Sequence, residues 1–126
     1  MVLMNWAKQT IANLIGGSTT LIPAYFMIGS GSGTVALTQT QLVHAADRQI
    51  FTTINNETAY KIKYTGDWNA IEMSGLGAPN AFPLREIGIS ISGAGITGSM
   101  WSNINFPAIN FNGLNELRVE ENWEIF

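Results

Sequence analysis

The sequence predicts a mainly β fold, an antiparallel β-sandwich preceded by a short N-terminal α-helix. Two observations lead to this prediction: several short runs alternate between apolar and polar residues, and glycine, asparagine and proline separate these runs. A third is the charged content of 12%, about half the share of an average globular domain. So few charges are typical of a turn-rich β domain and also of a surface that neighbouring subunits cover, and we expect both.

The 126 residues are enough for a single domain with an unaided core. Within it we expect residues 1–17 to form a helix or arm, and residues 22–126 to form a sandwich of about six to eight strands. The helix should span Asn5 to Ile15, with Asn5 capping its start and Gly16-Gly17 providing a left-handed stop. It packs either on its own sheet or on a neighbour. Its apolar residues recur at steps of three and four: Leu3, Ala7, Ile11, Leu14 and Ile15.

The middle of the chain contains three expected strands. Ala24–Ile28 is a buried run, Gln49–Ile54 is a second candidate, and Tyr60–Thr65 alternates apolar residues with outward lysines. Between the first two we expect Gly29–Gly33 to be a flexible loop and Thr38–Asp47 to form one or two helical turns.

Two further expectations concern the ends of these strands. Asn55-Asn56 predicts a turn, and Trp68–Met73 should continue the strand that begins at Tyr60. Ser74–Pro83 carries two glycines and two prolines, which is typical of a loop.

The last part of the chain should form three strands of one antiparallel sheet, at Leu84–Ile91, Met100–Ile109 and Leu117–Phe126. A glycine-rich turn separates the first two. Pro107 cannot donate a ladder hydrogen bond, which predicts an edge position or a bulge there. Asn112-Gly113 predicts a hairpin, because both residues tolerate positive φ.

Glu121 interrupts the apolar face of the last strand. A buried carboxylate without a partner is costly, so we expect Glu121 either at the rim or beside Arg85 or Arg118. The rest of that face consists of Leu117, Val119, Trp123 and Ile125.

The glycine-rich loop Gly29–Gly33 does not match a phosphate-binding motif. A Walker loop ends in Gly-Lys-Ser/Thr, whereas Thr34-Val35 follows here, and the third glycine of the dinucleotide fingerprint is missing. We interpret the loop as a hairpin tip or as a connection between a strand and a helix.

His44 is the single histidine, and Asp47 follows three residues later. A local hydrogen bond between them in a helical turn is a better interpretation than a catalytic triad, because no Gly-x-Ser-x-Gly elbow is present. Trp68 follows Gly66-Asp67 and is the tryptophan we expect to be exposed, where it could stack on a sugar.

Two pairs of carboxylates could in principle act as a glycosidase pair, namely Asp67 with Glu72 or Glu86 with Glu121. We disfavour both, since no insertion predicts a cleft between them. No residue is assigned a catalytic, cofactor-binding or metal-binding role, and no cofactor is expected.

Charge and composition exclude several partners. Cysteine is absent, and the six basic residues are scattered, so neither a disulfide framework nor a nucleic-acid-binding patch is expected. The longest apolar run, Leu21–Ile28, contains Pro23 and is too short to span a membrane.

The order of several short motifs resembles small virion structural proteins of tailed bacteriophages. In that pattern a helix leads to a strand ending in isoleucine–glycine–small–glycine, followed by a leucine–x–glutamate strand, a glycine–x–methionine turn, a phenylalanine–proline strand and a closing aromatic strand. Here these motifs are Ile28–Gly33, Leu84–Ile89, Gly98–Met100, Phe106–Ile109 and Trp123–Phe126. Met100-Trp101-Ser102-Asn103 stands where related sequences often carry Ala-Arg.

This resemblance implies a structural protein that is not an enzyme and acts by protein–protein assembly in the virion, after assembly in the host cytoplasm. Its expected partners are copies of itself, as a homo-oligomer, and other virion proteins, with neither nucleic acid nor membrane among them. A tail, baseplate or fibre position is preferred over capsid decoration, and a carbohydrate- or receptor-binding module is a further alternative.

Overall fold

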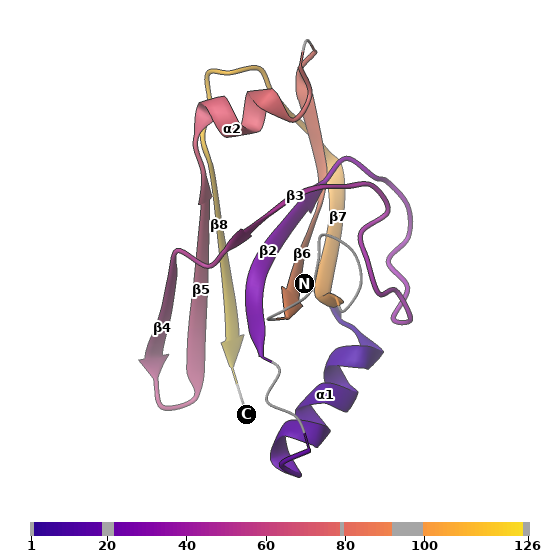
Figure 1. The fold of residues 1–126 in the computed structure, drawn as a ribbon, viewed down its shortest axis with the longest axis vertical. Coiled ribbons are helices and arrows are strands. Elements are labelled where there is room, and N and C mark those ends of the chain that lie inside the picture. Colours follow the sequence, from indigo (N-terminus) through magenta and orange to yellow (C-terminus); the bar gives the residue numbers. More distant parts are fainter. Residues whose placement is uncertain (1, 19–21, 79, 92–99, 125–126) are drawn as a thin grey trace.

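The computed structural model describes residues 2–18, 22–78, 80–91 and 100–124, which form two antiparallel sheets packed together (Figure 1). The predicted β-sandwich with a short N-terminal helix is therefore confirmed. The larger sheet has five strands in the order β1 (Val2–Leu3), β7 (Met100–Phe111), β6 (Phe82–Ile91), β2 (Pro23–Gly29) and β3 (Ala45–Ile50). The smaller sheet has three, in the order β4 (Thr53–Thr58), β5 (Lys61–Trp68) and β8 (Leu117–Glu124).

The N-terminal helix α1 spans Asn5–Ile15, as predicted. Asn5 does not cap it, because the extended chain of β1 continues to Met4, which becomes the N-cap without a side-chain hydrogen bond. Gly17 has a φ of 73°, the left-handed stop that glycine allows. Ala7 is buried and α1 contacts β7, so the helix packs on its own sheet. Among the described residues, no helix is long and apolar enough to cross a membrane.

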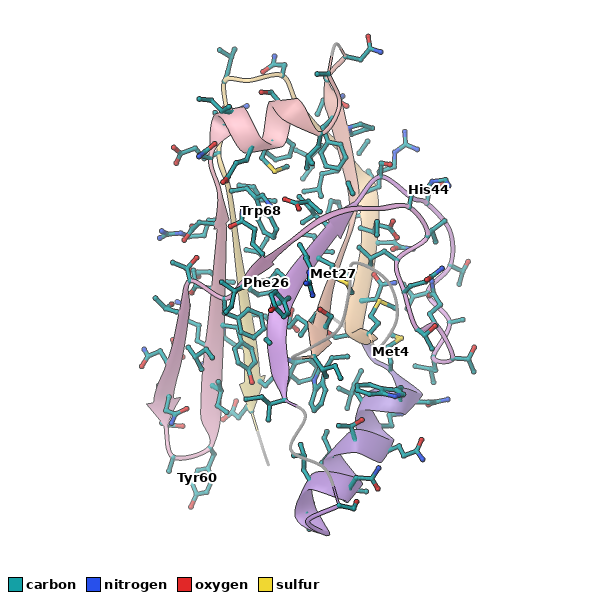
Figure 2. The ribbon with its side chains drawn as sticks, viewed as in Figure 1. Met4, Phe26, Met27, His44, Tyr60 and Trp68 are labelled. Carbon is teal, nitrogen blue, oxygen red and sulfur yellow. The ribbon has the colours of Figure 1, made fainter. Side chains whose placement is uncertain are left out.

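The main core lies between the two sheets and is rich in aromatic side chains (Figure 2). Phe26 of β2 and Trp68 of β5 are 0% and 1% exposed. The ring of Phe51 lies 4.9 Å from that of Phe26 and 4.5 Å from that of Tyr64, between centroids. The indole N–H of Trp68 donates a hydrogen bond to Asp47 Oδ2 at 3.0 Å, which satisfies its polar group. The expectation that Trp68 is exposed is therefore wrong.

β6 and β7 pair through a bulge near Pro107. Leu84 pairs with Ile109 and Glu86 pairs with Asn105, so four residue steps along β7 correspond to two along β6. Pro107 lies within this excess, where no ladder hydrogen bond is required of it. The bulge predicted from the proline is confirmed.

β7 and β8 do not pair with one another. Gly113 has a positive φ of 99°, and residues 112–116 carry the chain out of the larger sheet to β8, which pairs with β5 in the smaller sheet. The predicted hairpin at Asn112-Gly113, and the single sheet formed by the last three strands, are therefore wrong. A glycine turn serves equally well for a hairpin and for a crossover. Here the apolar side of β8, which includes Val119, reaches the core from the opposite sheet.

The predicted strand at Gln49–Ile54 is split between β3 and β4, because the chain crosses from one sheet to the other at residues 51–52. Asn55-Asn56 lies inside β4, so the turn predicted there is wrong; the turn is at residues 59–60. No helical turn forms at 38–47, where an irregular segment leads into β3.

The predicted continuation of β5 through Trp68–Met73 is also wrong, since helix α2 spans Ala70–Gly75. Asn69 Oδ1 accepts from the backbone N–H of Glu72 at 2.8 Å, and Glu72 Oε2 accepts from the N–H of Asn69 at 2.8 Å. This reciprocal capping box starts a helix and stops the strand.

Some expectations fall outside the described residues. These are the glycine turn at Gly93–Gly95, the residues before Met100 in the Gly98–Met100 motif, and the last two residues of the closing strand, Ile125 and Phe126.

We expect Trp68→Ala to lower the free energy of unfolding by about 4 kcal/mol, because it removes a large buried ring and leaves Asp47 without its donor. Urea denaturation measures this loss. Tyr60→Ala is the control, since Tyr60 is 69% exposed at the β4–β5 turn, and it should change stability by less than about 0.5 kcal/mol (Figure 2). Equal losses in both variants would contradict the assignment of Trp68 to the core.

Candidate functional site

A buried carboxylate holds the long connection between β2 and β3 against the larger sheet. We call this connection, residues 30–44, the strap (Figure 1, right). Glu86 of β6 is 0% exposed. Its Oε1 accepts hydrogen bonds from the backbone N–H of Gly31 at 3.0 Å and of His44 at 2.7 Å, and its Oε2 accepts from that of Val43 at 2.9 Å. Hydrogen bonds to an ionised acceptor are stronger than neutral ones, so this contact fixes both ends of the strap.

The glycines at the start of the strap leave the space that this carboxylate occupies. A Cβ on Gly29 would lie 2.5 Å from Glu86 Oε1, and a Cβ on Gly31 would lie 2.7 Å from the same atom. The Gly31 N–H, which a phosphate-binding loop would offer to an anion, binds Glu86 instead. β2 and β3 pair antiparallel with Gly29 opposite Ala45, so Gly29–Gly33 belongs to a hairpin connection, as one interpretation had it, although it opens the long strap and is not its tip. The alternative of a strand–helix connection is wrong.

The strap covers a second apolar cluster on the far face of the larger sheet. Met27 lies between Phe26 and Ile28, which face the main core, so its side chain points to the opposite face. The amide Nδ2 of Asn105 donates to the carbonyl of Gly33 at 2.6 Å and holds the strap over this face. The cluster consists of Met4, Met27, Leu42 and Met100, all at most 1% exposed.

His44 and Asp47 have separate roles. The His44 side chain is exposed on the strap, while its carbonyl accepts from the Ser30 N–H at 3.1 Å (Figure 2). Asp47 lies on β3 and accepts from the indole of Trp68. The helical turn that would have joined the two side chains does not form, so the predicted local hydrogen bond is wrong.

The candidate carboxylates engage other partners or lie on different faces of the sheets. Asp67 accepts a hydrogen bond from Arg118 Nε at 2.7 Å, which holds the pKa of the Asp67 carboxyl below its usual value. Glu72 caps α2. Glu86 lies beneath the strap, whereas Glu121 faces the space between the sheets, so the larger sheet separates them.

Glu121 lies on the core-facing side of β8 and is 8% exposed, so its expected position at the rim is wrong. Arg118, an expected partner, is on the other face of β8 and engages Asp67. Burial raises the pKa of the Glu121 carboxyl from its ordinary value of 4.5 to about 7.

The β4 edge of the smaller sheet is open. All six residues of β4 are exposed, including Ile54 at 58%, and β4 is the terminal strand of its sheet (Figure 1, left). Its one acidic residue, Glu57, pairs with Lys61 at 3.4 Å and with Lys63 at 3.8 Å. This strand therefore presents unpaired backbone groups with little net charge beside them.

Two of the other edges differ from β4. β1 pairs with β7 opposite residues 102–103, and Pro107 lies farther along the same strand. β8 exposes Glu120 and Glu124, and its opposite side packs in the core through Val119. Charged residues and proline are common protections of a sheet edge.

The sequence contained signals for the buried Glu86 contact and for the open β4 edge, although the motif analysis identified neither. A glutamate inside the apolar strand at Leu84–Ile91, together with the spacing Gly29-x-Gly31, indicated a buried carboxylate that needs backbone donors. The run Thr53–Thr58 has a single apolar residue, Ile54, which is typical of a strand at the margin of the core.

The chain matches no protein-family model and no curated protein.

We expect Glu86→Gln to lower the free energy of unfolding by about 3 kcal/mol, because the amide has one acceptor oxygen where three N–H groups need two. Hydrogen exchange of the backbone amides of Gly31, Val43 and His44 should become faster than in the wild type. Glu116→Gln, at an exposed position before β8, is the control and should leave both measurements unchanged. Unaltered exchange at all three amides in Glu86→Gln would contradict the role of this carboxylate.

The raised pKa of Glu121 predicts a pH dependence of stability. Between about pH 4.5 and pH 7 the folded protein holds a proton that the unfolded chain has lost, so stability falls as pH rises through this window. The total change is on the order of 3 kcal/mol. Glu121→Gln should remove this fall, whereas Glu124→Gln, exposed on the same strand, should keep it. Chemical denaturation across the pH range measures the difference, and parallel profiles for wild type and Glu121→Gln would contradict it.

Proposed function

We propose that this chain is a structural subunit of a bacteriophage virion, positioned on the tail, baseplate or fibre side, and that it acts by protein–protein assembly without catalysis. Its partners are copies of itself and other virion proteins.

The observation that carries this proposal is the open β4 edge. A strand whose six residues are all exposed, and whose single acidic side chain is neutralised by two lysines, can accept a further strand. Soluble proteins that act alone usually protect such an edge, whereas an edge that is paired in an assembly needs no protection.

The resemblance to phage structural proteins gains support from the Glu86 contact. The glycine motif at Ile28–Gly33 and the leucine–x–glutamate motif at Leu84–Ile89 are far apart in sequence, yet Glu86 binds the backbone of Gly31. Two of the motifs that carry the resemblance therefore meet in one structural contact.

Capsid decoration is the alternative within this class, and the same assembly surface serves it. Carbohydrate binding loses its main candidate, because Trp68 lies in the core and cannot stack on a sugar.

The proposal predicts that the intact chain is present in purified particles of the phage that encodes it, at a copy number that follows the rotational symmetry of the structure it joins. Mass spectrometry of separated tail and head fractions measures this. We expect the chain in the tail fraction, and its presence in heads alone would favour capsid decoration. Absence from both fractions would contradict the proposed function.

A further inference from the structure

We propose that β4 pairs edge to edge and antiparallel with β4 of a second copy of this chain. Two three-stranded sheets would then form one continuous sheet across a two-fold axis. This inference rests on the proposed function and deepens it, since it names the surface through which copies associate.

The backbone of β4 supplies the recognition. Over its regular part, Thr53–Asn56, this edge strand presents N–H and C=O groups at alternate residues along one side. β4 contains no proline, no outward lysine and no covering element within the described residues. The register with β5 shifts between Asn56 and Thr58, so a bulge distorts the end of β4, whereas Thr53–Asn56 keeps a regular edge without proline or lysine.

The charges of β4 permit self-pairing. A two-fold axis perpendicular to the sheet keeps the same face of both sheets on one side. The axis must therefore pass between one residue of β4 and the same residue of the second copy. If the axis passes through Asn55, then Glu57 lies opposite Thr53 of the second copy; if it passes through Asn56, then Glu57 lies opposite Asn55. Both registers keep the two Glu57 carboxylates apart.

Repulsion between like charges disfavours β8 as the self-pairing edge. Registers centred on Glu120 or Glu121 place that carboxylate directly opposite its own copy. These are the registers that pair most of β8, and like charges directly opposite are destabilising. A second copy therefore fits β4 better than β8.

Ile54 adds an apolar contribution. It pairs in register with Tyr64, so both side chains lie on the same face of the smaller sheet, yet Ile54 is 58% exposed. In either register the strand of the second copy covers part of this side chain, and burial of its apolar surface stabilises the pair.

The contact is small. A strand of six residues is about 20 Å long, and the area it buries is below the roughly 1,000 Å² of a typical stable interface. We therefore expect a weak dimer in the free protein, and cross-linking is the appropriate measurement.

The chain has no cysteine, so a single introduced cysteine reports only on its own position. We expect either Asn55→Cys or Asn56→Cys, but not both, to form an interchain disulfide under mild oxidation, because only the residue on the two-fold axis lies opposite its copy. Asn122→Cys on β8 and Ile71→Cys on α2 are exposed controls that should remain monomeric. All four positions are exposed, so folding should persist, and circular dichroism checks this.

Ile54→Lys should weaken the concentration-dependent dimer at least about tenfold in sedimentation, whereas Ile71→Lys, which removes an 82% exposed isoleucine elsewhere, should have no effect.

Failure of both Asn55→Cys and Asn56→Cys to cross-link, or preferential cross-linking of Asn122→Cys, would overturn the inference. A chain found in particles without this cross-link would retain the proposed function and lose the β4 pairing. Cross-linking of a chain that is absent from particles would support the β4 pairing and contradict the proposed function.

Discussion

The hydrogen bonds from three strap amides to the Glu86 carboxylate are the interaction on which the remaining structure depends. A carboxylate taken out of water needs strong donors, and the strap supplies them. Val43 and His44 stand immediately before β3, so the same contact fixes where the edge strand of the larger sheet begins. β3 leads directly into β4. The position of the open edge thus depends on a buried charge in the opposite sheet.

Glu86 reaches the strap because β6 changes face beside it. Leu84 and Ile87 both pack against the main core, although a regular strand would place them on opposite faces. The bulge at Pro107 accommodates this change, and Glu86 consequently points away from the core. A regular β6 would direct the carboxylate into the aromatic core, where backbone donors are already used in the ladders. The proline in β7 and the glycines of the strap therefore both contribute to the placement of Glu86 beneath the strap.

Local patterns predicted the elements whose stability is local. The bounds of α1, the buried strand β2 and the bulge at Pro107 follow from periodicity and from proline chemistry. The helix expected at 38–47 was wrong because Glu86, which is 42 residues from His44, decides that segment. The pairing of β8 was wrong for a similar reason: the turn at Gly113 permits two pairings, and burial of Val119 selects one. The capping box at Asn69 was readable from the sequence, since Glu72 follows it by three residues.

The distribution of charge decides how copies of this fold can meet. Glu57, Lys63 and Glu120 form a line of ion pairs across all three strands on the outer face of the smaller sheet, with separations of 3.8 and 3.3 Å. That face is polar, and its charges are already paired within one molecule, so stacking a second copy on it would desolvate ion pairs for little gain. The edge of the smaller sheet offers a second copy a different contact, within the plane of the sheet. On the side of β4 away from β5 the backbone groups have no strand partner among the described residues, and Glu57 is paired with lysines, so lateral addition of a strand satisfies hydrogen bonds without separating any ion pair.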